Sequence, residues 1–508
     1  MKYYLGLDNG GTTTKAAIFD IHGNELAVES AATQAHSEKP GFVERDMEEM
    51  WQANCRVIRG AVKKAGISPH EVAGIGICGH GKGLYLWGKD NRPVRNGIIS
   101  TDHRADSYVK LWQEDGTERQ AYELSCQHIM PSQPPALLAW LRDNEPDSYA
   151  NIQWVFECKD YVRFRLTGEA RAELTDYSGT SLLNLHTKSY DPMLLSLFGL
   201  EAIQDALPPL CDSLAICGYV SADAASACAL LPGTPVIGGM FDIDACALGV
   251  GITDESRVCM IAGTWSINEY IAKAPVLNKG VKMNSLFCLP GYYLIEESSP
   301  TSAANNEWFM RQLLPELKSE MSSRCFYDEI NHWVEDISPD EFVPIYLPFI
   351  MASNVNPDAK AAFIGLNASH TRRHLLRSVY EGVTFSHRMH FEKLMANRTA
   401  APDCIRLAGG AAHSTVWAQI FADVMQQPVE TVRADETGAL GCAIGVAFAL
   451  GDYESIEQAC AHMCATASHI VPRTENADIY RKKYELYKSA ISQLDPLWSK
   501  IQEFSDCK

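Results

Sequence analysis

The residues that first suggest chemistry stand where an apolar run near the N-terminus becomes polar. Asp8 ends the run that begins at Tyr3, and it is followed by Asn9-Gly10-Gly11-Thr12-Thr13-Thr14-Lys15. Glycines let a backbone approach a ligand closely, threonine hydroxyl groups and a lysine suit phosphate oxygens, and a carboxylate suits Mg²⁺. Because polar tips on β-hairpins are common, this segment alone favours a phosphate-binding loop only modestly.

Two further turns rich in glycine and small residues follow apolar runs later in the chain, at Gly263-Thr264-Trp265-Ser266 and at Gly409-Gly410-Ala411-Ala412-His413-Ser414. The first could hold phosphate in the same way, whereas a plain strand-to-helix turn is the competing interpretation of the second. A nucleotide between two halves of a chain needs its phosphates held by both halves and its purine–ribose end held by small residues. The three turns together predict this arrangement.

The candidate catalytic base is Asp242, which follows Gly238-Gly239 at the end of the apolar run 234–237. A carboxylate at the end of a strand can accept the proton of a hydroxyl group that attacks a γ-phosphate. The competing interpretation is a helix cap, a role that favours Asp244 over Asp242. Position alone leaves the two interpretations equal.

Two polar loops could hold a polyol. One contains His80 and Lys82, and the other contains Asp102 and Arg104. Surface loops carry the same residue types, so these four residues depend on further context.

Several common nucleotide and hydrolase motifs are excluded. Residues 74–79 match GxGxxG, but residues 80–86 are typical of a turn and a strand rather than of the helix that a dinucleotide site requires. The chain has neither GxxxxGK[ST] nor GxSxG, which excludes a P-loop and the usual hydrolase elbow.

The elements that would position these residues alternate between strands and helices. We expect a hairpin at 3–20, a strand at 72–77 that resumes at 83–87, and helices at 47–65, capped by Asp46, and at 149–166. The order of strand, Gly/Thr turn and strand recurs at 258–272, and helices are expected at 372–393, 414–425, 438–450 and 480–494. This pattern predicts an α/β protein with two related halves that meet near residues 250–257.

Composition limits the partners of the chain. Its 508 residues carry a formal net charge of −19, with 46% hydrophobic residues. The acidic excess argues against nucleic-acid and anionic-membrane partners. No apolar run reaches the roughly 20 residues of a membrane span, and the N-terminus lacks the features of a signal peptide, so a cytoplasmic protein is expected. The scattered cysteines are expected to be reduced thiols.

Combined motifs along nearly the whole chain resemble the FGGY carbohydrate kinases, the sugar-kinase branch of the actin-like ATPases. The resemblance is carried by Leu5 to Thr12, Lys159 to Gly168, Leu231 to Val236, Ala361 to Leu366 with His374 to Glu381, and Gly409 to Ala411. It implies an α/β fold of two actin-like (ribonuclease H-like) domains with an ATP/sugar cleft between them. The domains would be 1–252, for the sugar, the first phosphate loop and the catalytic aspartate, and 253–508, for the nucleotide.

The resemblance also assigns roles to residues. Asp242 matches the general base, Asp8 the acid near Mg²⁺, Gly11 to Thr13 the first phosphate loop, and Thr264 the phosphate contact of the second half. Gly410 and Ser414 match positions near the adenosine end, whereas Ala303 replaces the more usual glycine before Trp308, and Leu137 replaces a usual lysine. The cofactor-binding set is Gly10, Gly11, Thr12, Thr13, Lys15, Gly263, Thr264, Ala303, Gly409, Gly410 and Ser414, and the substrate set is His80, Gly81, Lys82, Asp102, Arg104 and Asp242.

The acceptor is the part of the resemblance that leaves alternatives. Gly81 and Lys82 occupy positions that vary with substrate in the family, and the set of loops is most similar to members that phosphorylate L-xylulose and 3-keto-L-gulonate. The alternatives are another acceptor (D-xylulose, D-ribulose, erythritol or glycerol) and an actin-like ATPase switch without sugar chemistry. The expected cofactors are ATP and Mg²⁺, and the expected partners are ATP and a small sugar, with a homodimer left open.

Overall fold

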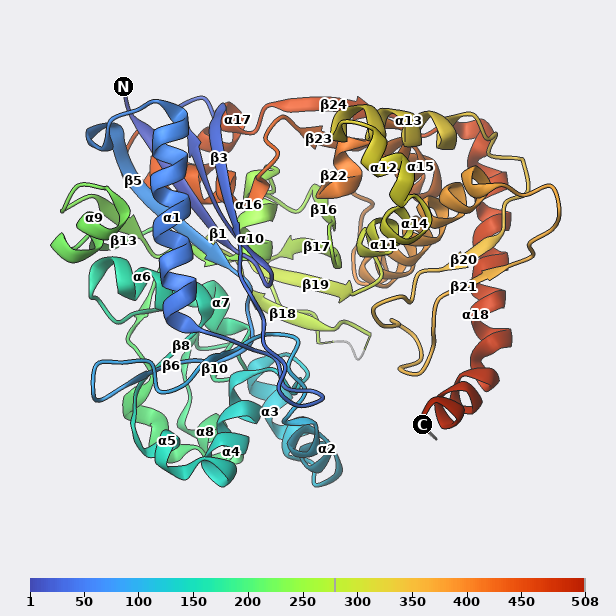
Figure 1. Cartoon of the computed structure of the whole chain (residues 1–508). Coiled ribbons are helices and arrows are strands. Elements are labelled where there is room, and N and C mark those ends of the chain that lie inside the picture. The colour runs from blue at the N-terminus through green and yellow to red at the C-terminus, as the bar shows by residue number, and fades with distance from the viewer. Residues whose placement is uncertain (278–279, 507–508) are drawn as a thin grey trace. The chain divides into compact units, whose positions relative to one another are not determined.

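The computed structural model describes residues 1–277 and 280–506, and its internal contacts group the chain into two compact units (Figure 1). The first unit comprises Met1–Thr253, Ile271–Ile295 and Arg433–Ala465, and the second comprises Asp254–Tyr270, Glu296–Val432 and Thr466–Lys508. Two segments from the later part of the chain therefore pack with the first unit. The linear domain boundary at 252/253 stays a prediction.

The first unit is built on a seven-stranded sheet of order β13-β14-β5-β1-β2-β3, with β15 paired to β5. β1 and β2 form the predicted hairpin. β5 runs parallel to β1, and β14 runs parallel to β5. The strands are β1 (Tyr3–Asn9), β2 (Thr13–Phe19), β3 (Glu25–Ala32), β5 (Val72–Gly79), β13 (Ile216–Tyr219), β14 (Pro235–Ile237) and β15 (Met240–Phe241). The GxGxxG glycines lie within β5, in agreement with the exclusion of a dinucleotide site.

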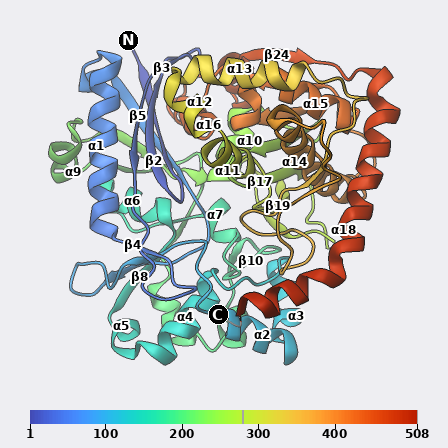
Figure 2. The same ribbon diagram turned by 45° about the vertical axis from the view of Figure 1, so that its right-hand side comes forward.

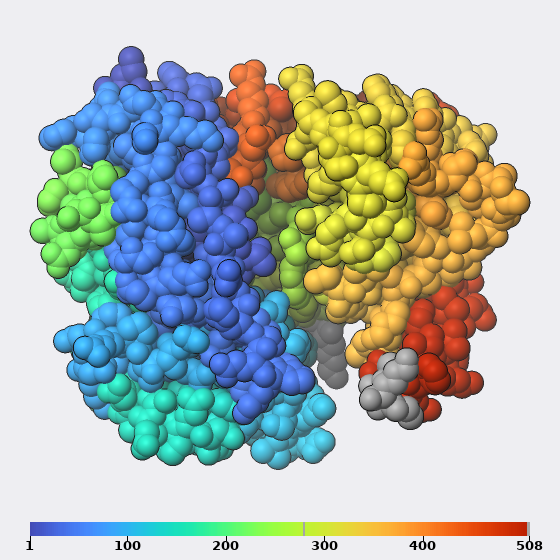
Figure 3. All heavy atoms as spheres, in the orientation of Figure 1, coloured from blue at the N-terminus to red at the C-terminus, as the bar shows by residue number. Residues whose placement is uncertain are grey.

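Helix α1 (Met47–Ala65) forms as the sequence predicts and covers one face of this sheet in Figures 1 and 2. The Asp46 side chain caps its first turn by accepting a hydrogen bond from the backbone N–H of Glu49 at 2.7 Å. Gly66 ends the helix in the left-handed conformation that glycine tolerates, with φ of 68°. The polar side of α1 lies at the surface, where Figure 3 shows it in light blue.

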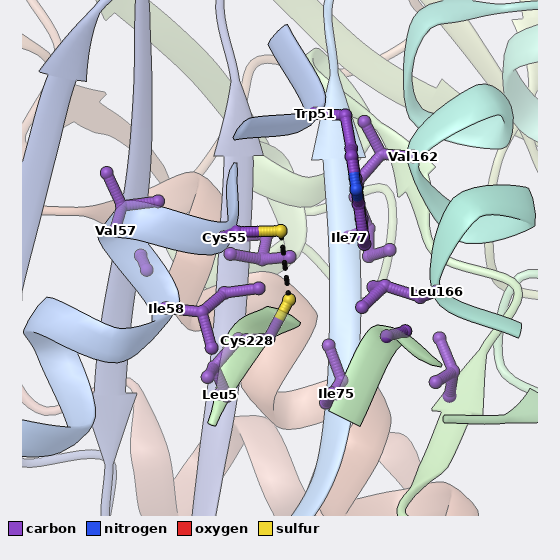
Figure 4. Close-up of a cluster of buried hydrophobic side chains, with 14 of the residues drawn as sticks. Leu5, Trp51, Cys55, Val57, Ile58, Ile75, Ile77, Val162, Leu166 and Cys228 are labelled. Carbon is purple, nitrogen blue, oxygen red and sulfur yellow. Dashed lines mark hydrogen bonds between the residues drawn. The ribbon is translucent and has the colours of Figure 1, made fainter. Parts of the chain in front are cut away.

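The core of the first unit lies between α1, the sheet and helices α6 (Cys158–Thr167) and α9 (Ala222–Cys228). Figure 4 shows its packing: Leu5, Ile75 and Ile77 project from the sheet toward side chains of these helices. The thiols of Cys55 and Cys228 lie in this core, 3.3 Å apart and fully buried. Here cysteine serves as a small apolar residue.

The helix that carries Asp242, α10 (Asp242–Gly249), crosses α16 (Thr437–Ala449) through glycines. A Cβ atom at Gly249 would lie 2.0 Å from the Thr437 carbonyl oxygen, and one at Gly441 would lie 1.9 Å from the Ala245 carbonyl oxygen. Only glycine permits backbones to approach this closely.

We expect Gly441→Ala to destabilise the protein by about 1–3 kcal/mol relative to Gly445→Ala, because overpacking against a backbone has this cost. Gly445 is the matched control, since it lies in the same helix and a Cβ atom there would meet only side-chain ends, at 3.0–3.3 Å. Urea unfolding of the two variants measures the difference. Equal stabilities would show that α10 and α16 separate easily.

The second unit repeats the strand order of the first. β16 (Arg257–Ala262) and β17 (Ser266–Ala272) form an antiparallel hairpin, and β22 (Cys404–Ala408) runs parallel to β16. β23 (Val429–Val432) and β24 (Thr466–Ile470) continue the sheet. The prediction of a recurring strand, turn and strand is therefore confirmed.

Helices of the second unit cover this sheet and include three of the predicted ones: α14 (Arg372–Met395), α15 (Thr415–Met425) and α18 (Ala477–Asp506). In Figure 2, α18 is the long red helix at the edge of the unit. Its buried residues Tyr480, Tyr484 and Tyr487 lie close to the Phe385 ring of α14. The apolar side of the helix predicted at 480–494 therefore packs against the body of the unit.

One predicted helix, at 149–166, is wrong. The structure has α5 (Pro146–Ala150), then β8 (Ile152–Phe156), and then α6. β8 pairs antiparallel with β6 (Tyr85–Gly88), and its β-branched and aromatic residues favour a strand once a partner strand is present.

The remaining elements connect these layers. In the first unit they are β4 (Glu44–Arg45), β7 (Gly97–Ile98), β9 (Ala172–Glu173), β10 (Leu183–Asn184), β11 (Ser189–Tyr190), β12 (Leu210–Cys211), β18 (Met283–Leu286), α2 (Asp106–Glu114), α3 (Thr117–Ser125), α4 (Pro134–Asn144), α7 (Leu174–Ser178), α8 (Pro192–Leu197) and α17 (Ile456–Met463). Most of β19 (Tyr293–Ser299) belongs to the second unit, with α11 (Ala304–Leu313), α12 (Pro315–Glu320), α13 (Ser323–Glu335), β20 (Ile345–Leu347) and β21 (Ala362–Ile364). Within the described ranges, no helix is both long enough and apolar enough to cross a membrane.

Candidate active site

The first glycine turn joins β1 to β2 and leaves its backbone accessible. Gly10 donates its N–H to the Thr13 carbonyl at 3.0 Å, while Gly11 and Thr13 are partly exposed and Thr12 is exposed. The guanidinium of Arg45 donates to the carbonyls of Gly10, at 3.2 Å, and Gly11. Arg45 thus fixes the loop through two backbone carbonyls. No local sequence motif indicates this role.

Asp8 lies at the end of β1, opposite Lys15 in β2. The pKa of Asp8 is raised to about 6, mainly by burial and also by the charge of Glu436, whereas Lys15 and the Cys78 thiol oppose the shift. The Lys15 ammonium is held by Glu436, at 2.8 Å and 2.9 Å from its two carboxylate oxygens. Lys15 is therefore already paired within the first unit, and its proposed contact with phosphate stays a prediction.

Asp242 lies at the same edge of the sheet as Asp8. It directly follows β15, in which Met240 is opposite Cys78 of β5, and Asp8 is opposite Cys78 on the other side. Burial raises the pKa of Asp242 well above its usual value; the charge of Asp8 adds to the shift, and Lys82 opposes it. The two predicted carboxylates are thus close enough to affect one another.

The alternative role of these acids as helix caps is wrong. Asp242 is the first residue of α10, Phe241 occupies the cap position, and no side chain caps the helix. Asp244 is the third residue of α10 and is fully buried. Burial raises its pKa well above the usual value. Because the helix already starts at Asp242, both acids lie inside its first turn.

The turn before Asp242 requires its two glycines. Gly239 has φ of 80°, and a Cβ atom there would lie 2.1 Å from the Ile77 carbonyl oxygen. A Cβ atom at Gly238 would lie 2.2 Å from the Asp212 carbonyl oxygen, and the buried Arg163 donates a hydrogen bond to the Gly238 carbonyl. These contacts fix the direction in which the chain enters α10.

The loop at His80 to Lys82 follows β5. Tyr85 donates its hydroxyl to His80 Nε2 at 2.8 Å, and His80 Nδ1 donates to the Gly81 carbonyl at 3.3 Å. Burial, with the charge of Arg45, lowers the pKa of His80 to about 3, so its ring is neutral. Lys82 is half-buried with φ of 65°, and its charge reaches Asp242.

Asp102 and Arg104 engage one another instead of the Asp242 segment. Arg104 Nε and one terminal nitrogen donate to the two Asp102 carboxylate oxygens at 2.9 Å and 2.8 Å, and the same terminal nitrogen donates to Glu44 at 2.7 Å. The Arg104 guanidinium lies over the rings of Phe42 and Trp140. In the part of the chain that the structure describes, none of these bonds reaches Asp242.

A layer of buried charges, carried by α6, β9 and α7, adjoins the Asp242 segment. The Lys159 ammonium contacts carboxylate oxygens of Asp160, Glu173 and Asp176 at 2.8 Å, 3.0 Å and 3.5 Å, and Arg163 contacts Asp160 at 2.8 Å. All five side chains are almost completely buried. The sequence motif at 159–168 contains the cations, but no pattern connects them to residues 173 and 176.

This charged layer is attached to the Asp242 segment by a hydrogen bond. Thr175 Oγ1 accepts from the backbone N–H of Phe241 at 2.9 Å, and it donates to Glu173 at 2.8 Å. The charge of Asp176 also contributes to the raised pKa of Asp242. The ion-pair layer therefore both holds the Asp242 segment in place and raises the pKa of the candidate base.

The second unit brings together four of its predicted cofactor residues. Ala303 donates its N–H to the Gly263 carbonyl at 2.8 Å, and its Cβ atom would lie 3.7 Å from a Cβ atom at Gly410. Gly409 has φ of 78° and packs against the backbone at Ala262. Small residues at each of these positions give the two turns a shared accessible backbone.

The other two predicted residues of this unit flank that cluster. Thr264 is exposed in the β16–β17 turn. Ser414 caps α15 by accepting from the Trp417 N–H at 3.2 Å and donates its hydroxyl to Asn331 at 2.7 Å. The segment Gly409 to Ser414 thus joins β22 to α15, and its contact with a nucleotide stays a prediction.

The donor set of the first unit fits Mg²⁺ held together with a nucleotide. Among residues 1–277 and 280–506, no group of three or more His, Cys, Asp or Glu side chains could hold a metal ion. Mg²⁺ usually takes one or two protein carboxylates and completes its shell with water and substrate phosphates. Asp8, an acid at the end of a strand beside an accessible glycine turn, meets this requirement.

Comparison with known proteins agrees with these features. Residues 3–249 match the N-terminal domain model, and residues 258–450 the C-terminal domain model, of the FGGY family of carbohydrate kinases. The chain is 37% identical over 505 residues to the L-xylulose/3-keto-L-gulonate kinase of Escherichia coli strain K12, with 99% of each chain covered. It is 36% identical over 498 residues to a probable L-xylulose kinase of Pasteurella multocida, covering 97% of this chain and 99% of the relative. The crystal structure of a xylulose kinase from Rhodospirillum rubrum has a TM-score of 0.85 at 24% identity, covering 98% of this chain and all of the other.

Proposed function

Since the chain belongs to the FGGY family of carbohydrate kinases, a family of ATP-dependent sugar kinases with two actin-like domains, we propose that its acceptor is a ketopentose, namely L-xylulose. The observation that carries this proposal is the 37% identity, over 99% of both chains, to a relative named for L-xylulose and 3-keto-L-gulonate. The neutral sugar is proposed first because the candidate site is already rich in carboxylates.

In the proposed mechanism, Asp242 accepts the proton of the sugar hydroxyl group that attacks the γ-phosphate. Burial and the neighbouring Asp8 and Asp176 make Asp242 a stronger base than an exposed aspartate, and Lys82 limits that shift. The exposed backbone of Gly10 to Thr13 would hold phosphate oxygens. Asp8 would hold Mg²⁺, which would neutralise charge on the transferred phosphoryl group.

An acceptor screen tests the proposal. ATP consumption is measured with L-xylulose, 3-keto-L-gulonate, D-xylulose, D-ribulose, erythritol and glycerol, and the highest kcat/KM is expected with L-xylulose. A preference for any other acceptor would refute L-xylulose as the acceptor and leave the sugar-kinase activity unaffected. ATP hydrolysis indifferent to every sugar would instead favour an actin-like switch.

Lys82 is proposed to determine how well an acidic sugar is accepted, because its ammonium can pair with a carboxylate. Lys82→Met is expected to lower kcat/KM for 3-keto-L-gulonate about tenfold more than for L-xylulose, the size of a charge-assisted hydrogen bond. Any effect through Asp242 would be common to both sugars and cancels in the ratio. Lys82→Arg is the matched control and should retain the ratio; equal losses with both sugars in Lys82→Met would contradict the role.

A further inference from the structure

A buried histidine of α14 is bonded to residues that lead to the two ends of the second glycine turn, 263–266, and it has no part in the proposed mechanism. The imidazole of His387 lies with Nδ1 2.8 Å from Asn268 Oδ1 and with Nε2 2.9 Å from Ser302 Oγ. The Phe421 ring packs against it edge to face, with 5.1 Å between the ring centroids. His387, Asn268 and Ser302 are fully buried, and all of these residues belong to the second unit.

The hydrogen-bond partners define which nitrogen of the ring carries the proton. The side-chain nitrogen of Asn268 donates to the Glu297 carbonyl at 3.3 Å, so the side-chain oxygen of Asn268 faces His387 and accepts. His387 Nδ1 therefore donates, and Nε2 accepts from the Ser302 hydroxyl. Burial, with the charge of His390, lowers the pKa of His387 well below its usual value, so the ring is neutral. One neutral tautomer satisfies both bonds.

The two partners of the imidazole lead to opposite ends of the turn. Asn268 donates to the Ser266 hydroxyl oxygen at 3.1 Å, and Ser266 is both the last residue of the turn and the first residue of β17. Ser302 directly precedes Ala303, whose N–H donates to the Gly263 carbonyl at 2.8 Å. A shift of the ring therefore reaches both ends of the turn.

Helix α14 also holds the segment 299–302 at two further points. Ser386 and Thr301 share a hydrogen bond between their hydroxyl groups at 2.6 Å, and His390 Nε2 lies 2.7 Å from Ser299 Oγ. The hydroxyl oxygens of Ser299 and Thr301 are 2.7 Å apart. Figure 2 shows α14 beside β19, the strand that ends at Ser299. The path of this segment is therefore set by α14.

The tip of the turn is exposed, whereas the residues that support it are buried. Thr264 is exposed and Trp265 is 39% exposed, but Ser266 and His387 are fully buried. A loop that is held in one conformation before its ligand arrives avoids the entropy cost of being ordered on binding. The contacts of His387 thus fix the ends of the turn and leave its exposed tip to a ligand.

We propose that His387 is a positioning residue for the phosphates of the nucleotide: it holds the turn 263–266 in the conformation that binds them, and it does not itself touch the nucleotide. This inference rests on the proposed function and on the predicted contact of Thr264 with phosphate. Asp242 and the loop at Lys82 belong to the first unit. Replacing His387 should therefore raise the KM for ATP more than it lowers kcat, and should leave the KM for the sugar nearly unchanged.

The test measures nucleotide binding directly, by isothermal titration calorimetry of the full chain with a non-hydrolysable ATP analogue and Mg²⁺. His387→Phe keeps a ring of similar size and removes both hydrogen bonds. We expect this variant to raise the Kd for the analogue at least about tenfold, the size of one hydrogen bond to a charged phosphate group. Steady-state kinetics with ATP and the best acceptor from the screen then separate the effect on KM from the effect on kcat.

Two smaller changes separate the two contacts of the ring. His387→Asn keeps an amide donor as far along the side chain as Nδ1, and His387→Gln keeps an amide oxygen as far along as Nε2. Each variant retains one of the two bonds, so each Kd should lie between those of the wild type and of His387→Phe. If His387→Phe does not fold, these two variants decide, and both must bind the analogue at least about threefold more weakly than the wild type, the size of one neutral hydrogen bond.

A control variant distinguishes positioning of the turn from a general loosening of the second unit. Asn476→Leu breaks a buried hydrogen bond of 2.7 Å to Asp423, elsewhere in the same unit. Losing a buried hydrogen bond should lower the urea midpoint, while the Kd for the analogue should stay within about threefold of the wild type.

Two results would overturn the inference: a Kd for the analogue that is unchanged in His387→Phe, and an equal rise of the Kd in Asn476→Leu. The wild type separates this failure from that of the proposed function. If the wild type binds no analogue, the proposed function itself fails. If the wild type binds the analogue and His387→Phe binds it equally well, only the positioning role of His387 fails.

Discussion

Replacing Asp242 by asparagine is expected to lower kcat by roughly 10²- to 10⁴-fold, the usual contribution of a general base. Asparagine has the same size and cannot accept the proton of the attacking hydroxyl group. The KM for ATP should change little, because no predicted phosphate contact belongs to this side chain. Steady-state kinetics with the best acceptor from the screen measure both constants.

The matched control for this variant is Asp244→Asn, two positions further along the same helical turn. Asp244 is fully buried and lies in the same helix, so its replacement tests whether any loss of an acid in α10 lowers the rate. We expect Asp244→Asn to change stability more than kcat. A kcat for Asp242→Asn within threefold of the wild type would refute the role of Asp242 as the base.

Local chemistry in the sequence was enough to predict the elements that carry the candidate site. The α1 boundaries follow from Asp46 at one end and Gly66 at the other, and the hairpin at 3–20 follows from alternating apolar residues around a glycine turn. Signals of this kind depend on neighbours in the chain. They fail for β8, whose strand conformation depends on pairing with β6 more than sixty residues away.

The contacts of the candidate site that the sequence did not predict are also formed between residues far apart in the chain. Lys15 is paired with Glu436, which is 421 positions away in the chain, and no spacing rule connects the two. Asp102 and Arg104 show the converse: their residue types suit a sugar, but the structure joins them in a bidentate pair that also contacts Glu44. Polar residues in a loop predict hydrogen bonding without indicating the partner.

The buried charges that adjoin the Asp242 segment lead to the largest expected effect on stability. Lys159→Met removes the cation that contacts three buried carboxyl groups, those of Asp160, Glu173 and Asp176. Among the described residues, Arg163 is then the only cation left in their ion pairs. Removing one partner of a buried ion pair typically costs about 3–5 kcal/mol. Urea unfolding at pH 8 should show a loss of this size in the apparent free energy of unfolding.

The pH dependence of this loss separates an electrostatic cause from a packing cause. Burial raises the pKa of Asp176 to about 8 even though the charge of Lys159 lowers it, so losing Lys159 raises that pKa further. A carboxyl group whose pKa is raised in the folded state lowers stability progressively as pH rises from the ordinary pKa of aspartate up to the raised value, and causes no further loss above it. Because Lys159→Met has the higher raised pKa, its loss continues to a higher pH than that of the wild type. The difference between Lys159→Met and the wild type should therefore be smaller at pH 5.5 than at pH 8.

A surface pair provides the control for this comparison. Lys482 contacts Asp478 at 2.7 Å, with exposed fractions of 68% and 59% for the two side chains, and exposed pairs contribute about 0–1 kcal/mol. Lys482→Met should therefore change the free energy of unfolding by less than 1 kcal/mol at either pH. If Lys159→Met behaved like Lys482→Met, or if its loss were equal at both pH values, the buried cation would not be what holds these acids in the folded protein. The support that we assign to the layer beside the Asp242 segment would then have to come from packing alone.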